Sequence, residues 1–289
     1  KYQLRGEILS FIPVDKNVEI MLVTITNTGR MAQTVTPTAA IPLYGRSADN
    51  IRDHRHVTSL LHRIETTDTG VLVTPTLSFD ERGHQVNHMT YYCVGWSGNG
   101  EKPVDFYPTA EDFVGEGGNF ERPYAIVKNA EGVKAGTKIE GLEAVGGLHF
   151  SEITLEPEEE CSYLIFTGIT EDIQEIRNLS KTYTTREKVL EELEKTKAYW
   201  QEKVAYHTGD SDFNQFMHWV SFQPILRRIY GCSFLPHHDY GKGGRGWRDL
   251  WQDCLALLIM NPDGVRQMLL DNFAGVRVDG SNATIIGSK

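Results

Sequence analysis

The chain has 289 residues, which is enough to bury a substantial core and long for one domain, so we expect two structural units. Its 29 Lys and Arg residues stand against 39 Asp and Glu, and the resulting net charge of −10 argues against a nucleic-acid surface. No apolar run reaches the roughly 20 residues that cross a bilayer, so no membrane association is expected. The cysteines lack the paired spacing of metal ligands or of a disulfide framework, which favours a reduced, cytoplasmic protein. They are Cys93, Cys161, Cys232 and Cys254.

The first part of the chain, from residue 2 to about residue 168, has the pattern of an all-β domain. Val18–Thr26 is rich in β-branched residues and stops at Asn27-Thr28-Gly29, and Tyr91–Trp96 runs into a glycine-containing turn. Many such strands, joined by Gly- and Pro-rich connections without helices between them, predict an antiparallel β-sandwich over residues 1–170. The polar, glycine-rich stretch 112–122 is expected to be a surface loop.

The hydrophobic period changes after Gly168. Residues 171–207 place apolar residues three and four apart among many charges, which predicts an amphipathic helical linker. Further helices are predicted over 213–230, bent or started at Pro224, and over 247–260 and 265–273. Residues 208–289 should therefore form a second, all-helical region.

The segment that precedes the helix at 247–260 concentrates chemical groups. Its glycines at 241, 243, 244 and 246 are costly to order unless the backbone must approach a ligand closely. Lys242, Arg245 and Arg248 add positive charge before and within a helix N-terminus, whose unpaired amides also favour anions. Arg245 and Asp249 are four residues apart, as are Trp247 and Trp251, so each pair shares one helix face. Together these residues predict a pocket that binds sugars and anions.

Structural explanations of the same residues remain open. An Arg–Asp pair at a helix start is often an ion pair that holds the fold, and two Trp at helical spacing are often core residues. His237-His238-Asp239 is interpreted as a hydrogen-bonded loop cluster rather than a metal site, because no HExxH helix or cysteine partner accompanies it. No metal and no organic cofactor are expected.

The block Gly244-Arg245-Gly246-Trp247-Arg248-Asp249-Leu250-Trp251-Gln252-Asp253 resembles the Gly-x-Gly-Phe-Arg-Asp-x-x-Gln-Asp motif of glycoside hydrolase family 94, the inverting phosphorylases of the cellobiose phosphorylase type. Trp247 stands where Phe is usual and keeps an aromatic ring. The order of the parts is also similar: a super-sandwich, a helical linker and then the first helices of an (α/α)6 barrel. Residues 279–284 resemble the stretch that follows those helices.

The resemblance implies an enzyme that cleaves β-glucosidic bonds of glucooligosaccharides with inorganic phosphate and inversion, giving α-glucose 1-phosphate. Phosphate is then a co-substrate, and details of the block lean towards β-1,2-linked glucans. The family's pattern implies that Asp249 accepts hydrogen bonds from sugar hydroxyl groups, that Arg248 orients it or the sugar, and that Trp247 and Arg245 belong to the same substrate site. Lys242 falls near a family arginine that contacts sugar or phosphate. The general acid is expected beyond Lys289, so the isolated chain is expected to be inactive and incomplete.

Two other interpretations of the sequence remain open besides the phosphorylase. A glucoamylase-like glycoside hydrolase also combines a sandwich with a helical barrel and needs two barrel carboxylates. A non-catalytic glycan-binding or oligomerisation module would instead bind sugar through sandwich aromatics such as Trp96, or pack against a twin subunit to form a homodimer.

Overall fold

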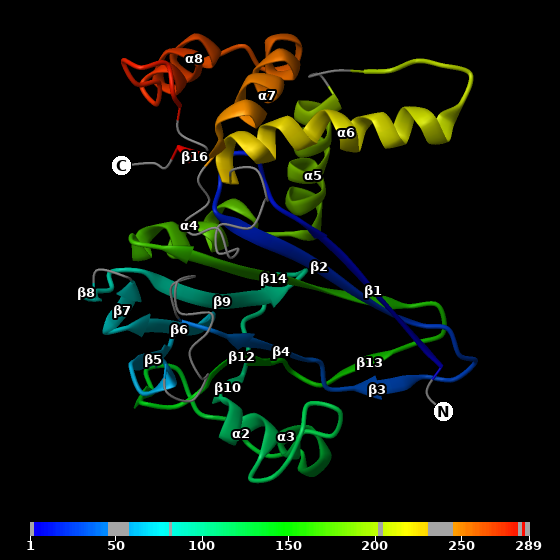
Figure 1. Cartoon of the computed structure of the whole chain (residues 1–289). Helices are drawn as coiled ribbons and strands as arrows, with labels where there is room; N and C mark the ends of the chain where they lie inside the picture. Colours follow the sequence, from blue (N-terminus) through cyan, green and yellow to red (C-terminus); the bar gives the residue numbers. More distant parts are fainter. Residues whose placement is uncertain are drawn as a thin grey trace. The chain divides into compact units, whose positions relative to one another are not determined.

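The structure is a computed structural model that describes residues 3–45, 58–80, 83–201, 205–230, 245–282 and 285–286 (Figure 1). The chain forms two compact units, Lys1–Thr196 and Lys197–Lys289. The boundary between them falls inside helix α5 (Arg186–Gln201), within the segment expected to be a linker. We describe each unit by itself.

The first unit is built on a seven-stranded antiparallel sheet, and a three-stranded antiparallel sheet packs against one of its faces (Figure 1). In spatial order the larger sheet contains β1 (Leu4–Phe11), β2 (Val18–Asn27), β14 (Glu160–Thr170), β9 (Thr90–Ser97), β6 (Gly70–Pro75), β5 (His62–Thr66) and β11 (Lys138–Glu140). The smaller sheet contains β10 (Asp105–Thr109), β12 (Ala144–His149) and β4 (Thr38–Leu43). Two short ribbons, β3 (Gln33–Val35) with β13 (Ile153–Leu155) and β7 (Leu77–Asp80) with β8 (Gly83–Val86), extend this arrangement. The predicted antiparallel sandwich is confirmed.

The core between the two sheets follows from strict alternation along the strands. On β6, Val71 and Val73 are fully buried towards the smaller sheet, where they join Leu148 of β12. The sheets approach each other closely at Gly146 of β12, because a β-carbon added there would lie 2.2 Å from Cβ of Cys93. Only a residue without a side chain fits at this contact.

The opposite face of the large sheet is also covered, which explains why its central strands are apolar at consecutive positions. On β14, Leu164 and Phe166 point away from the smaller sheet and pack against Ile176 and Leu179 of α4 (Ile173–Thr182). Asp172 caps α4 by accepting a hydrogen bond from the Gln174 amide at 2.8 Å. The central strands of the large sheet are thus buried on both faces within the first unit.

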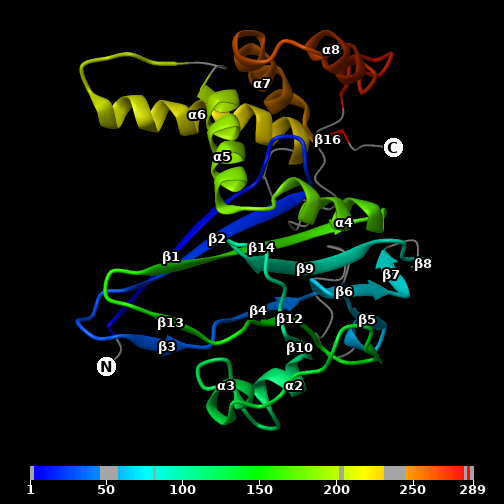
Figure 2. The same ribbon diagram turned by 180° about the vertical axis from the view of Figure 1, so that it is seen from behind.

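Two short helices lie between strands, where none was expected. They are α2 (Ala110–Val114) and α3 (Tyr124–Lys128), and both lie against the outer side of the small sheet (Figure 2). The Thr109 side chain accepts a hydrogen bond from the Asp112 amide at 3.0 Å and so starts α2, while Phe113 is buried. The expectation of a helix-free sandwich, with a surface loop over all of 112–122, was therefore wrong at α2 and α3.

The second unit is helical, as predicted. It contains α6 (Ser211–Tyr230), α7 (Trp247–Met260) and α8 (Val265–Phe273), together with the short pair β15 (Arg245–Gly246) and β16 (Ile285–Ile286). Its core includes Cys254 and Leu257 of α7 and Val265 and Met268 of α8. The α6 helix continues through Pro224. No helix among the described residues has the length and apolar composition that a membrane span requires.

Candidate functional site

The predicted sugar- and anion-binding residues lie around the start of α7. Trp247 is its first residue, and Arg245 belongs to β15 immediately before it. Trp247 and Arg248 are described in full, whereas only the backbone is described for Arg245 and Asp249. Lys242 and the His237-His238-Asp239 cluster lie outside the described residues.

Trp247 is tied to the end of α8 by two hydrogen bonds. Its indole Nε1–H donates to the backbone oxygen of Asn272 at 3.1 Å, and the Asn272 Nδ2 donates back to the Trp247 backbone oxygen at 3.3 Å. The Trp247 ring meets the Trp251 ring edge to face at 5.6 Å between centroids, and Trp251 meets Phe273 in the same way at 4.9 Å. The two tryptophans therefore pack α7 against α8.

Two buried polar atoms beside this contact have no hydrogen-bond partner among the described residues. Asn272 is 1 % exposed, and its Oδ1 atom has no hydrogen bond within the described part of the chain. The same holds for Nε1 of Trp251, which is also buried. A buried polar group without a partner costs about 1–3 kcal/mol. Such a group therefore usually forms a hydrogen bond to a further molecule, such as a ligand or an ordered water. One acceptor and one donor are thus available next to the predicted site.

Arg248 is exposed on the surface of α7, one residue inside the helix. At this position the positive charge of Arg248 lies at the positive end of the helix dipole. This arrangement costs stability unless an anion or an acidic group nearby compensates the charge. Arg248 takes part in an interaction with its surroundings.

A cavity of about 450 Å³ in the second unit lies elsewhere. It is lined by Trp200, His218, Trp219, Ser221, Phe222, Ile225 and Met260. Met260 is the last residue of α7, about 20 Å along the helix from Trp247 at a rise of about 1.5 Å per residue. The predicted site residues therefore do not line this apolar cavity.

Neither a metal centre nor a thiol nucleophile emerges from the described residues. No group of three or more His, Cys, Asp or Glu side chains is arranged there to hold a metal ion. Burial raises the pKa of the Cys93 thiol to about 12, so it behaves as a small core side chain. Cys254 is also buried, and Cys232 lies outside the described residues.

Trp96, the aromatic residue considered for sugar binding by the sandwich, cannot present its ring to a ligand. It is 3 % exposed, stacks on Phe166 with centroids 4.7 Å apart, and donates its indole N–H to the Tyr183 backbone oxygen at 2.8 Å. The suggestion that Trp96 is a sugar platform was wrong. The alternation on β9, which places Tyr92, Val94 and Trp96 on one face, indicated that Trp96 would be buried.

Comparison with known proteins identifies relatives of the chain. A model of the glycosyl hydrolase 94 supersandwich domain matches residues 1–186. The chain is 26 % identical over 194 residues to cyclic beta-(1,2)-glucan synthase NdvB of Rhizobium meliloti (strain 1021). That alignment covers 65 % of this chain and 6 % of the relative, so the chain spans a small part of that protein's length. The matched domain ends before α7 and does not include the Arg248–Asp249 pair.

Proposed function

Because the chain belongs to the glycosyl hydrolase 94 family, through its supersandwich domain, we propose that it serves an inverting phosphorolysis of β-glucosidic bonds. The proposed substrates are a glucooligosaccharide and inorganic phosphate, and the proposed products are a shortened oligosaccharide and α-glucose 1-phosphate. The name of the relative, a cyclic β-(1,2)-glucan synthase, supports a β-1,2-linked glucan as the substrate class. In this proposal the helices of the second unit belong to an (α/α)6 barrel.

The observation that carries the proposal is the run from Gly244 to Asp253 at the start of α7. It places Arg248 and Asp249 in the first turn of a helix that follows a glycine-rich stretch. In the proposed site the Asp249 carboxylate accepts hydrogen bonds from sugar hydroxyl groups, and Arg248 orients that carboxylate or the sugar. An aspartate beside a guanidinium stays ionised, so Asp249 is not proposed as the general acid.

Phosphorolysis requires two functions at the reacting carbon. A carboxylic acid protonates the glycosidic oxygen as its bond to the anomeric carbon breaks, and a phosphate oxygen forms a bond to that carbon from the opposite face. Phosphate is already an anion, so cationic side chains and backbone amides that hold it replace the base of an inverting hydrolase. The proposed holders here are Lys242, Arg245 and the amides at the α7 N-terminus. The proposed proton donor lies outside residues 1–289.

The tryptophans have a supporting role in this proposal. Trp247 holds the start of α7 against Asn272, which keeps the neighbouring Arg248 and Asp249 in place. The unpartnered Oδ1 of Asn272 and Nε1 of Trp251 support a polar ligand close to this end of the helix.

The test is the phosphate dependence of glucan cleavage by the protein that contains this chain. β-1,2-Glucooligosaccharide is incubated with and without phosphate, and the released anomer is identified by NMR. Phosphate-dependent α-glucose 1-phosphate supports the proposal, whereas free glucose released equally well without phosphate identifies a hydrolase.

A further inference from the structure

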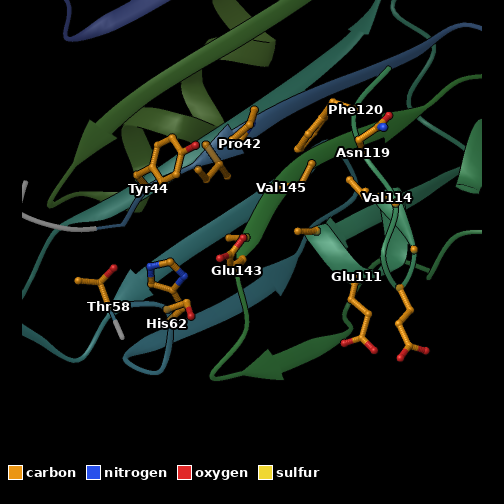
Figure 3. A pocket seen from close by; sticks show the side chains of 17 residues that line it. Pro42, Tyr44, Thr58, His62, Glu111, Val114, Asn119, Phe120, Glu143 and Val145 are labelled. Atoms are coloured by element: carbon orange, nitrogen blue, oxygen red, sulfur yellow. The ribbon is translucent and has the colours of Figure 1, made fainter. Parts of the chain in front are cut away.

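A second candidate binding site lies in the first unit and shares no residue with the site assigned above. A cavity of about 470 Å³ opens between the end of β4, the residues before β5, helix α2 and the start of β12 (Figure 3). His62, Thr58 and Tyr44 lie at one end of it, Asn119 and Phe120 at the other, and Glu143 between them (Figure 3). Its volume lies within the usual range for small-ligand sites, about 300–1,000 Å³.

The cavity contains a buried nitrogen, Nε2 of His62, for which the described residues provide no donor. His62 is 3 % exposed, and its Nδ1 atom lies 3.1 Å from the backbone oxygen of Leu142. A carbonyl oxygen only accepts, so Nδ1 carries the proton and Nε2 carries a lone pair. Within the described residues Nε2 makes no hydrogen bond. Burial lowers the pKa of His62 against the opposing effects of its backbone contacts with Leu142 and Gly45 and of the Glu143 carboxylate, so the ring is neutral at pH 7.

The charged groups of the lining narrow the ligand class. They are Glu111, Glu116 and Glu143, and the described lining contains neither lysine nor arginine. Among the described lining residues, this acidic surface opposes a phosphate or sugar phosphate, because the three carboxylates repel an anion. The described residues also provide no cluster of ligands for a metal ion. The ligand class that suits this cavity is therefore one rich in hydrogen-bond donors.

Two exposed aromatic side chains add apolar surface to the same cavity. Phe120 is 47 % exposed and Tyr44 is 48 % exposed, and Phe120 is supported from behind by Phe113 at 5.9 Å between ring centroids. Aromatic faces beside carboxylates suit a sugar ring, whose C–H face packs on the aromatic group while its hydroxyl groups donate to the oxygens. The Asn119 Oδ1 accepts from the amides of Glu121 and Arg122, which holds the loop that carries Phe120.

We propose that this cavity binds a neutral glucan chain, with a sugar hydroxyl donating to Nε2 of His62, other hydroxyl groups donating to Glu143, and a sugar ring packed on Phe120. The site would hold the polysaccharide at a second point, distinct from the residues at the start of α7. The choice of a β-1,2-glucan as the chain rests on the proposed function.

The experiment measures the binding of β-1,2-glucooligosaccharide by calorimetry in the Asp249→Ala background, so that the proposed substrate site contributes little. Phe120→Ala and Glu143→Gln change surface-accessible positions and should each weaken binding at least tenfold. The matched controls, Phe213→Ala on α6 and Glu152→Gln after β12, are exposed residues outside the cavity and should bind as the parent does. Unchanged affinity in both cavity variants would overturn the proposal.

A second readout observes His62 directly and does not depend on catalysis. In protein labelled with ¹⁵N-histidine, the Nε2 resonance that His62→Gln removes should shift on adding the glucan and stay unchanged on adding inorganic phosphate. A shift caused by spermidine but not by the glucan would contradict the proposal and indicate a cationic ligand. If the protein phosphorolyses the glucan while this resonance stays fixed, the second site is wrong and the proposed function stands.

Discussion

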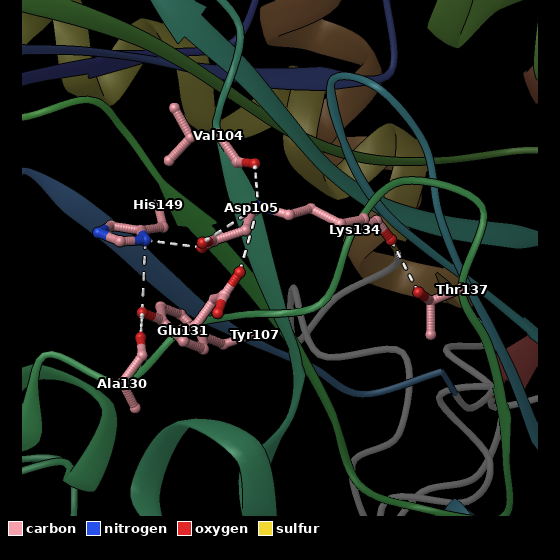
Figure 4. A network of polar contacts seen from close by, with 8 residues as sticks. All are labelled: Val104, Asp105, Tyr107, Ala130, Glu131, Lys134, Thr137 and His149. Atoms are coloured by element: carbon pink, nitrogen blue, oxygen red, sulfur yellow. Dashed lines mark hydrogen bonds and ion pairs between the residues drawn. The ribbon is translucent and has the colours of Figure 1, made fainter.

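Asp105 and His149 face each other across β10 and β12, with the carboxylate Oδ1 2.6 Å from the imidazole Nδ1 (Figure 4). The Asp105 side chain is 6 % exposed, and its second oxygen lies 3.9 Å from Nζ of Lys134. The Tyr107 hydroxyl donates to the Ala130 backbone oxygen at 2.6 Å and lies 3.4 Å from the same His149 nitrogen. This network fixes the loop after α3 to the small sheet.

The two partners of this pair should not be equally important for stability. His149→Ala leaves the buried Asp105 carboxylate with only the distant Lys134 among the described residues, and we expect a loss of about 3–5 kcal/mol in unfolding free energy. Asp105→Ala removes the buried carboxylate itself and leaves an imidazole that is 15 % exposed, and should cost about 1–2 kcal/mol. Urea unfolding at pH 7 measures both values. His88→Ala, at an exposed position, is the control, and equal losses for the pair would refute the asymmetry.

Close packing of the two sheets predicts a large effect from a small change. Gly146→Ala would put a β-carbon 2.2 Å from Cβ of Cys93 in the middle of the core, and should destabilise the first unit by about 1–3 kcal/mol. Gly209→Ala is the matched control, because a β-carbon there has no atom within 4 Å. The thermal unfolding midpoints of the two variants are compared with that of the wild type. An unchanged midpoint for Gly146→Ala would show that the two sheets can move apart enough to accept the added methyl group.

Burial of His62 predicts a pH dependence of stability. Its pKa is lower in the folded chain than the ordinary value of about 6.5, so below about pH 6.5 the unfolded state binds more protons than the folded state. Stability is therefore fully present above that pH and falls as the pH drops through the folded pKa. His62→Gln should show a smaller fall in unfolding free energy between pH 7.5 and pH 5 than the parent. Identical pH profiles would mean that His62 takes up its proton as easily in the folded state as in the unfolded state.

Trp247 offers a test of the link between α7 and α8. Trp247→Phe keeps an aromatic ring but removes the donor to the Asn272 oxygen, and should destabilise the second unit by about 1–2 kcal/mol. Hydrogen exchange of the amides in α8 should accelerate, while those of β14 in the first unit should not change. Acceleration in neither region would show that the indole hydrogen bond adds nothing.

The sequence predicted the elements that have a long, regular pattern. The β-branched run of β2 and the apolar run of β9 marked strands, and three- and four-residue spacing located α7 and α8 to the residue. Helix α2 was missed because its five residues are too few to show a helical period, and it depends on the Thr109 cap and the burial of Phe113.

The contacts of the candidate site were harder to predict than its position. The start of α7 followed from its glycines and charges, but the partner of Trp247 is Asn272, which lies 25 residues later and meets it only through tertiary packing. The cavity around His62 has the same origin, because its walls come from β4, α2 and β12, which are far apart in the sequence. No local sequence pattern predicts such a site.

The central claim is that Asp249 binds the sugar during phosphorolysis. It is tested by the rate of α-glucose 1-phosphate formation from β-1,2-glucooligosaccharide and phosphate, followed by ³¹P NMR with the protein that contains this chain. Asp249→Ala should lower kcat/KM by on the order of 10²- to 10³-fold, because hydrogen bonds that strengthen in the transition state are lost, while the unfolding midpoint stays unchanged. Asp271→Ala, at an exposed position of α8, should keep the parent rate. Near-normal turnover by Asp249→Ala, or its failure to fold, would contradict the account.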